Sequence, residues 1–133
     1  MTIGELSQLY CLSKEVEEDC ERLRALRAKA SSPTGANLSG MPGNRVYENR
    51  LERYVGEIVD LENEIILKIA RCFKERQKLE RYIASIPDSL TRRIFTYRFV
   101  HGLSWRQVAF HVGGGNTEDS VKKTAYRYIR KSG

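Results

Sequence analysis

Residues 102–131 read GLSWRQVAFHVGGGNTEDSVKKTAYRYIRK, and this stretch decides the fold of the C-terminal part of the chain. Two segments with helical spacing flank three consecutive glycines, and the second segment is rich in Lys, Arg and Tyr. Glycine loses more conformational freedom on folding than any other residue, so three in a row are costly to order. The stretch therefore predicts a turn that sets two short helices at a fixed angle.

The first of these two helices has a complete start signal. Ser104 is the predicted N-cap, and Gln107 three residues later completes a capping box. Leu103 before the cap and Val108 after it form a hydrophobic staple. Trp105 is predicted to pack as a partly buried wedge, because large aromatic side chains mostly pack. The inward face of this helix is predicted to consist of Val108, Ala109 and Val112.

The second helix is predicted over residues 118–131, with Asn116 or Thr117 as its cap. Its apolar positions recur with helical spacing and should pack inward: Val121, Ala125, Tyr128 and Ile129. Its outward face should then carry Ser120, Lys122, Lys123, Tyr126, Arg127 and Arg130. A buried short helix that supports an exposed basic helix is the pattern of a helix-turn-helix, whose second helix can enter a major groove.

The residue types on this outward face suit double-stranded DNA. Lys and Arg neutralise phosphates and release counterions, Arg can bond guanine with two hydrogen bonds, and Ser or Thr can reach base edges. The start of the second helix, with Asn116 and Thr117, could hold a phosphate, and Arg106 is placed along the flanking backbone. The predicted nucleic-acid-binding set is Arg106, Asn116, Thr117, Ser120, Lys122, Lys123, Tyr126, Arg127 and Arg130. A basic three-helix bundle that docks to protein would look similar.

A third short helix is predicted just before this pair, over residues 89–100. Pro87 stops the preceding segment, Asp88 or Ser89 can cap the new helix, and Gly102 ends it. Its inward residues are predicted to be Leu90, Ile94, Tyr97 and Val100. Residues 88–133 are therefore predicted to form a three-helix DNA-binding domain.

Residues 1–87 are predicted to form a long, coiled-coil-like helical hairpin. One amphipathic helix covers residues 3–30, a second runs from about residue 46 to residue 86, and a flexible loop at 31–45 rich in Pro and Gly joins them. The whole chain is thus expected to be all-α. The apolar seam is short for a stable two-helix unit, so we expect the N-terminal helices to form a homo-oligomer. The alternative is a hairpin that only covers the C-terminal helices of its own chain.

The charge distribution supports the division at residue 87. The whole chain has a formal net charge of +6, yet residues 1–87 contain 14 Lys and Arg and 14 Asp and Glu. Residues 88–133 contain nine Lys and Arg and three Asp and Glu, so the excess lies in the last third. A neutral segment joined to a basic one indicates that the basic one binds an anion, most often nucleic acid.

Several other classes of protein are not expected. The three cysteines lack C-x-x-C spacing, which predicts reduced thiols and no metal site. No apolar run approaches the length of a membrane span and no signal peptide is recognised, so we expect no membrane partner and a cytoplasmic location. No phosphate-binding glycine loop and no nucleophile–base pair is evident, so neither a cofactor nor enzymatic activity is expected.

The stretch GLSWRQVA, its glycine turn and SVKKTAYRYIRK together resemble region 4 of sigma-70-type factors. The turn in this chain is about two residues longer than in that family. A fuller resemblance is to phage regulators of the ArpU/RinA type, carried in order by ERLRALRAKASS, LSGMPGN, IVDLENEI and SWRQVA…GGGNTEDSVKKTAYRYI. This resemblance implies a phage or prophage transcriptional regulator that activates late genes in a bacterial host cell, with a coiled N-terminal part and a sigma-region-4-like DNA-binding end. Host RNA polymerase is a further candidate partner.

Two other functions fit the same arrangement. A phage terminase small subunit also combines a helix-turn-helix with a coiled-coil oligomerisation segment, although its DNA-binding end usually comes first. A protein adaptor would use the C-terminal helices to bind RNA polymerase, although the basic charge of the last helix argues against this as its sole role. Promoter choice and the sign of regulation follow from the family resemblance alone.

Overall fold

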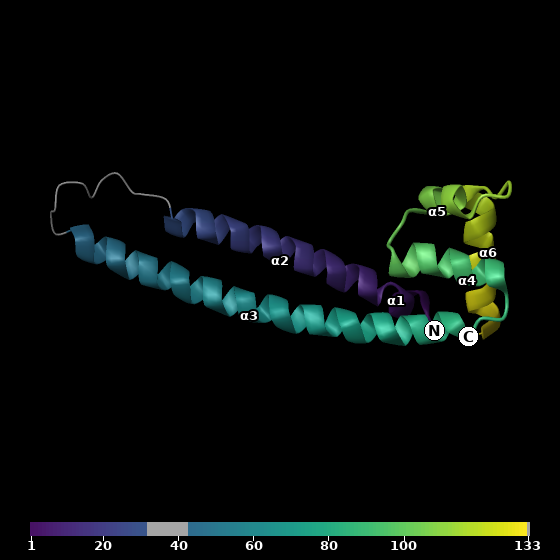
Figure 1. Cartoon of the computed structure of the whole chain (residues 1–133), viewed down its shortest axis with the longest axis horizontal. Coiled ribbons are helices and arrows are strands. Elements are labelled where there is room, and N and C mark those ends of the chain that lie inside the picture. Colours follow the sequence, from purple (N-terminus) through teal and green to yellow (C-terminus); the bar gives the residue numbers. More distant parts are fainter. Residues whose placement is uncertain (32–42, 133) are drawn as a thin grey trace. The chain divides into compact units, whose positions relative to one another are not determined.

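The computed structural model describes residues 1–31 and 43–132, and these residues are helical with no β-strand among them. The predicted all-α fold class is therefore confirmed for this part of the chain (Figure 1). The elements are α1 (Ile3–Leu6), α2 (Gln8–Ser31), α3 (Gly43–Ala84), α4 (Ser89–Phe95), the π-helical turn η2 (Thr96–Val100), α5 (Trp105–Val112) and α6 (Glu118–Ser132).

The first predicted helix is divided in two. Residues 3–30 were expected to form one helix, whereas Ser7 separates α1 from α2. Thr2 caps α1 by accepting a hydrogen bond from the backbone N–H of Glu5, and the N–H of Ser7 closes α1 on the carbonyl oxygen of Ile3 at 2.9 Å. The four-residue helix α1 thus begins and ends with its own local hydrogen bonds. The spacing of apolar residues, on which the prediction of one continuous helix was based, does not reveal such bonds.

The second predicted helix has different bounds from those expected. It begins at Gly43 rather than at residue 46, and α2 includes Ser31, so the ends of the predicted loop 31–45 are helical. The remainder of that loop, residues 32–42, lies outside the described residues. At its other end α3 stops at Ala84, and the N–H of Ile86 donates to the carbonyl oxygen of Ile83 at 3.0 Å. This tightened turn precedes Pro87, because a residue before proline is disfavoured in helical conformation.

The chain divides into two compact units, Met1–Ser13 together with Arg71–Gly133, and Lys14–Ala70. These units differ from the predicted segments 1–87 and 88–133. The reason lies in one apolar cluster of the first unit, which contains Leu6 from α1, Leu79 and Ile83 from α3, and residues of α4 to α6. The first turns of the chain and the last turns of α3 therefore share a core with the C-terminal helices.

Phe95 lies at the centre of this core. Its ring centroid is 5.2 Å from that of Phe99, 5.6 Å from that of Tyr128 and 6.3 Å from that of Tyr82. Phe95 and Phe99 are buried, whereas Leu90, Tyr97 and Val100 of the predicted inward set are only partly buried. Leu90, Tyr97 and Val100 nevertheless pack against the cluster, and the unpredicted burial of Phe99 follows from the π-helical turn η2, whose wider hydrogen-bonded repeat shifts the helical phase after Phe95.

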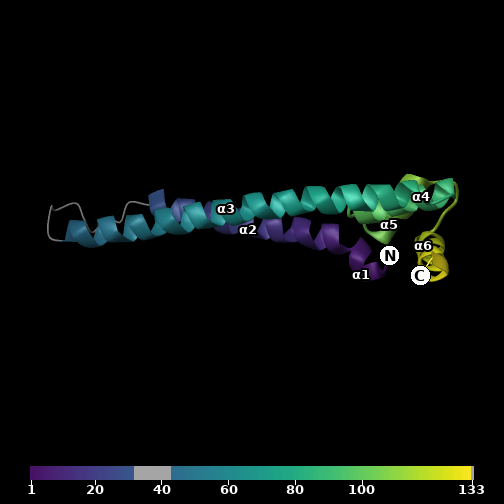
Figure 2. The same cartoon turned by 90° about the horizontal axis from the view of Figure 1, so that it is seen from below.

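The unit Lys14–Ala70 contains the facing parts of α2 and α3, which lie side by side in both views (Figures 1 and 2). Leu23, Leu61 and Ile65 are its buried apolar residues, and Val16, Cys20, Leu26 and Ile58 pack partly buried against them. Two ion pairs join the helices, Asp19–Lys68 and Arg27–Glu62. Asp19 precedes Arg27 along α2, whereas its partner Lys68 follows Glu62, the partner of Arg27, along α3. These two segments therefore run antiparallel in a defined register.

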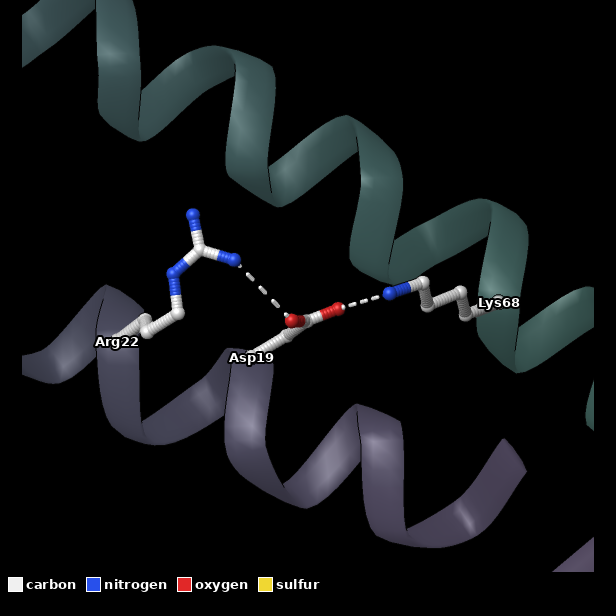
Figure 3. A network of polar contacts seen from close by, with 3 residues as sticks. All are labelled: Asp19, Arg22 and Lys68. Carbon is white, nitrogen blue, oxygen red and sulfur yellow. Dashed lines mark hydrogen bonds and ion pairs between the residues drawn. The ribbon is translucent and has the colours of Figure 1, made fainter. Parts of the chain in front are cut away.

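Asp19 is a buried carboxylate on α2, and its side chain lies between those of Arg22 and Lys68 (Figure 3). Lys68 Nζ donates to Asp19 Oδ2 at 2.7 Å, and Arg22 Nη1 lies 3.5 Å from Oδ1. The hydrogen bond from Lys68 to Asp19 raises the pKa of the Lys68 ammonium group. Because Asp19 is buried, removing Lys68 would leave its carboxylate with only the longer contact to Arg22, so Asp19 and Lys68 specify the register of α2 against α3.

Asp88 caps α4 and has an altered acidity. Its Oδ2 accepts hydrogen bonds from the backbone N–H of Thr91 at 3.0 Å and from the Thr91 hydroxyl at 2.6 Å. These bonds favour the ionised carboxylate and lower the pKa of Asp88. The Arg92 guanidinium donates nearby to the carbonyl oxygens of Ile86 and Pro87, at 2.7 and 3.0 Å. The junction between α3 and α4 is thus held by one carboxylate and one guanidinium group.

The lowered pKa of Asp88 predicts acid sensitivity. The native state loses this proton more readily than the unfolded chain, so the stabilisation is present above about pH 3.9 and is lost as the pH falls through the native pKa. Asp88→Asn keeps an N-cap acceptor but does not titrate. Thermal unfolding followed by circular dichroism should show the melting temperature of the wild type falling more steeply than that of Asp88→Asn below about pH 5. Parallel curves for the two proteins would contradict this role of the carboxylate.

Candidate nucleic-acid interface

The predicted capping box at the start of α5 is confirmed. The backbone N–H of Gln107 donates to Ser104 Oγ at 3.2 Å, and the backbone N–H of Ser104 donates to Gln107 Oε1 at 3.0 Å. Val108 is fully buried, and Leu103 packs partly buried against the same apolar cluster. Two N–H groups that would lack a helical partner are thereby satisfied, and the direction in which the chain enters α5 is fixed.

Trp105 is buried, in agreement with the prediction that its side chain packs against the neighbouring helices. Its ring lies perpendicular to that of Phe99 at 6.4 Å, and the Arg98 guanidinium lies 4.6 Å from its centroid. Arg98 Nη1 also donates to the carbonyl oxygen of Leu103 at 2.9 Å. Trp105 and Arg98 therefore connect η2 to the start of α5 through a cation–π contact and a hydrogen bond.

The turn between α5 and α6 has a backbone that requires glycine. Gly113, Gly114 and Gly115 have φ values of 68°, 63° and 76°. Gly113 also has ψ −152°, a combination that is essentially confined to glycine. Its N–H donates to the carbonyl oxygen of Ala109 at 3.0 Å and closes α5. The three glycines thus redirect the chain, so that α6 runs across the direction of α4 and α5 (Figure 1).

Polar side chains complete the turn on the α6 side. The Asn116 side-chain amide donates to the carbonyl oxygen of Gly113 at 2.8 Å. Thr117 is the N-cap of α6, because its Oγ1 accepts from the N–H of Ser120 at 3.1 Å, and Ser120 Oγ accepts from the N–H of Thr117 at 2.8 Å. Ser120 Oγ also lies 3.3 Å from Asn116 Oδ1. Asn116, Thr117 and Ser120, three members of the predicted binding set, therefore bond to the turn and to one another.

The inward face of α6 agrees with the prediction. Val121 and Ala125 are fully buried, and Tyr128 and Ile129 pack partly buried against the same cluster. The rest of the helix surface carries five exposed cations, Lys131 among them, for which the described residues provide no hydrogen-bond or ion-pair partner. We call the four that belong to the predicted binding set the basic face of α6: Lys122, Lys123, Arg127 and Arg130.

Tyr126 occupies a different environment from the one predicted. It was assigned to the outward face, but its side chain is partly buried against the apolar cluster, with its ring centroid 6.0 Å from that of Trp105. The physical reason is the proximity of α5, whose buried aromatic residue provides a packing surface beside α6. Tyr126 therefore contributes to the contact between α5 and α6.

The outer side of α5 contains one predicted site residue and one that the sequence analysis missed. Arg106 is exposed, as expected. Phe110, one helical turn further on, is 83% exposed, and its ring contacts His111 edge-on with centroids 5.6 Å apart. Its position could have been recognised, because Val108, Ala109 and Val112 occupy the inward face and leave residue 110 outside. Arg106 and Phe110 lie at i and i+4, so they are neighbours on the α5 surface.

Residues 1–31 and 43–132 contain no group of three or more His, Cys, Asp or Glu side chains placed to hold a metal ion. Among the helices described, none combines the length and the apolar character that a membrane span requires.

Comparisons of the chain with protein-family models, with curated proteins and with solved structures found no match. The resemblance to region 4 of sigma-70-type factors and to ArpU/RinA-type regulators therefore stays a prediction based on the residues quoted for it.

The turn can be tested by adding a single methyl group. Gly113→Ala should destabilise the protein by about 1–3 kcal/mol, because alanine rarely adopts the observed backbone conformation. Steric contact is not the cause, since no atom lies within 4 Å of the added Cβ. Gly56→Ala is the matched control. Residue 56 lies inside α3, also has no atom within 4 Å, and should gain about 0.5–1 kcal/mol. Thermal unfolding distinguishes them, and equal effects of the two substitutions would contradict the strained turn.

Proposed function

We propose that this chain is a sequence-specific double-stranded DNA-binding protein in which α5 and α6 form a helix-turn-helix. The observation that carries the proposal is the basic face of α6, which is exposed while Val121 and Ala125 on the other side of the helix are fully buried. A helix anchored on one side and cationic on the other suits insertion into a groove lined by phosphates.

The dimensions of α6 agree with this role. It contains 15 residues, which corresponds to a length of about 22 Å at about 1.5 Å per residue. The major groove of B-DNA is about 12 Å wide and admits one α-helix. Lys123 and Arg130 are seven residues apart and lie on nearly the same line along the helix, with Arg127 beside them. Arg127 and Arg130 are the residues best suited to reading guanine, and Lys122 and Lys123 to contacting phosphates.

The turn supports the proposal through its rigidity. Side-chain hydrogen bonds of Asn116, Thr117 and Ser120 fix the start of α6, and the Trp105–Tyr126 contact joins its middle to α5. Base readout requires a helix held in one orientation, since a small displacement removes bidentate hydrogen bonds. Asn116, Thr117 and Ser120 then act by positioning α6, and the basic face makes the contacts.

The remainder of the chain is assigned to self-association and regulation. The antiparallel segments of α2 and α3 form a helical hairpin through which copies of the chain associate, as their amphipathic pattern suggests. The resemblance to ArpU/RinA-type regulators supports a phage or prophage regulator that activates late genes in the bacterial cytoplasm. A dimer would place two copies of α6 on successive half-sites of an operator.

A second function, binding to RNA polymerase, is favoured by one specific observation. Phe110 is 83% exposed on α5 and lies beside exposed Arg106. A large aromatic side chain in water next to an Arg is typical of a contact with another protein. In an activator, this surface of α5 would contact the polymerase while α6 holds the DNA.

The basic face predicts a specific salt dependence. The double variant Lys122→Ala, Lys123→Ala should weaken duplex binding and reduce the slope of log K against log salt concentration by about two, because two phosphate contacts are lost. The measurement is a titration of labelled duplexes at several salt concentrations, with fragments of the source genome compared with a random duplex. Preference for one fragment would identify an operator.

The matched control removes the same charge from another helix. Lys74 and Lys78 are exposed on α3 and one helical turn apart, so Lys74→Ala, Lys78→Ala changes the net charge equally without altering α6. This control should keep the wild-type slope. If both double variants lose affinity equally, only the total charge matters and α6 is not the reading helix. An unchanged slope in the α6 variant would reject the assignment.

A further inference from the structure

An exposed apolar stripe runs along α3 within the unit Lys14–Ala70. Its members are Val55, Val59, Ile66 and Ile69, whose exposed fractions lie between 41% and 63%. Aliphatic side chains of this size are costly to leave in water, and a contiguous exposed apolar patch usually marks an interaction site. The contact between α2 and α3 leaves these side chains exposed, so the stripe is expected to bind something else.

The members of the stripe follow coiled-coil spacing. Positions 55, 59, 62, 66 and 69 are separated alternately by four and three residues, which is the repeat of a helix packed against another helix. Position 62 is Glu62, the one polar residue in the series. Its Oε1 accepts from Arg27 Nη2 of α2 at 2.9 Å. The carboxylate is therefore already compensated by α2, and the apolar stripe passes beside it.

This stripe is distinct from the surface of α3 that faces α2. The residues facing α2 are Ile58, Leu61, Ile65 and Lys68. At about 100° per residue, the two series lie on adjacent sides of the helix, so that Ile65 is buried while its neighbour Ile66 is 63% exposed. α3 thus carries two apolar seams within this unit, and α2 covers only one of them.

The covered seam is small. Within the described part of the unit, Leu23, Leu61 and Ile65 are the only buried apolar side chains of the core. Most helical stability in proteins comes from packing an amphipathic face, and small domains with small cores depend on added contacts such as oligomerisation. A second helix surface over the stripe would supply the missing burial.

We propose that a second copy of this chain covers the stripe, with the stripe of one α3 packed against the same stripe of its partner. A two-fold interface uses the same surface on both subunits, and a periodic apolar seam is complementary to itself. Residues 14–70 contain nine Lys and Arg and eleven Asp and Glu, so two copies meet without strong repulsion. This near-balance offers no attraction to a strongly charged partner. The inference rests on the proposed self-association and specifies its surface.

Two neighbouring residues provide a sharp test. Ile66 and Leu67 are 63% and 65% exposed, yet they point about 100° apart, and only Ile66 belongs to the stripe. Ile66→Lys places a charge in the proposed interface, and Glu62 four residues earlier keeps the helix favourable by an i,i+4 pair. It should raise the dissociation constant of the oligomer by about a hundredfold, because a two-fold interface contains the substitution twice. Leu67→Lys should leave the dissociation constant unchanged.

The measurement is the mass of the full-length protein by sedimentation equilibrium over a range of concentrations, with helicity followed by circular dichroism. Val59→Lys repeats the test at a second stripe position and decides the matter if Ile66→Lys loses helicity. A dimer or higher oligomer that dissociates in the stripe variants, but not in Leu67→Lys, supports the inference. If neither stripe variant changes the dissociation constant of the oligomer, the stripe is not the interface, although self-association itself still holds. A wild-type protein that is monomeric at every concentration overturns both.

Discussion

Burial of the Phe95 ring is the interaction on which the rest of the C-terminal unit depends. Through Tyr82, Phe99 and Tyr128 it joins the end of α3 to η2 and to α6. Removing a fully buried aromatic side chain typically costs about 3–5 kcal/mol, which is comparable to the whole stability of many small domains. The orientation of α6, and with it the basic face, therefore depends on a contact on the buried side of that helix.

The glycine turn adds a second constraint on the same helix. Packing against Phe95 determines which side of α6 faces the core, and the conformation of Gly113 determines where the helix begins. The two constraints act on different parts of α6, since Tyr128 lies near its end and Thr117 at its start. A helix restrained at both ends presents its outer side chains in one orientation, which is the requirement for reading a regular surface such as a DNA groove.

Features that depend on residues close in sequence could be predicted. The Ser104–Gln107 capping box and the inward positions Val121 and Ala125 follow from local hydrogen bonding and from one helical period, and both are present. Features that depend on a change of helical phase or on contacts with distant residues could not be predicted. Phe99 is buried because the π-helical turn changes the helical phase, and Tyr126 is partly buried because it packs against Trp105. Leu6 belongs to a core formed mostly by residues more than 70 positions later. No periodicity in residues 1–30 indicates which distant helices will meet Leu6.

The side-chain charges of α6 are unevenly distributed along its axis. Glu118 and Asp119 lie in the first turn, Arg130 and Lys131 in the last, and the cap of Thr117 and Ser120 is closed by mutual hydrogen bonds. These charges compensate the helix macrodipole, whose positive end is the N-terminus. The start of α6 is thus electrically neutralised, and its positive potential increases toward the C-terminus. The electrostatic attraction of α6 for an anion is therefore stronger along its second half than at its start.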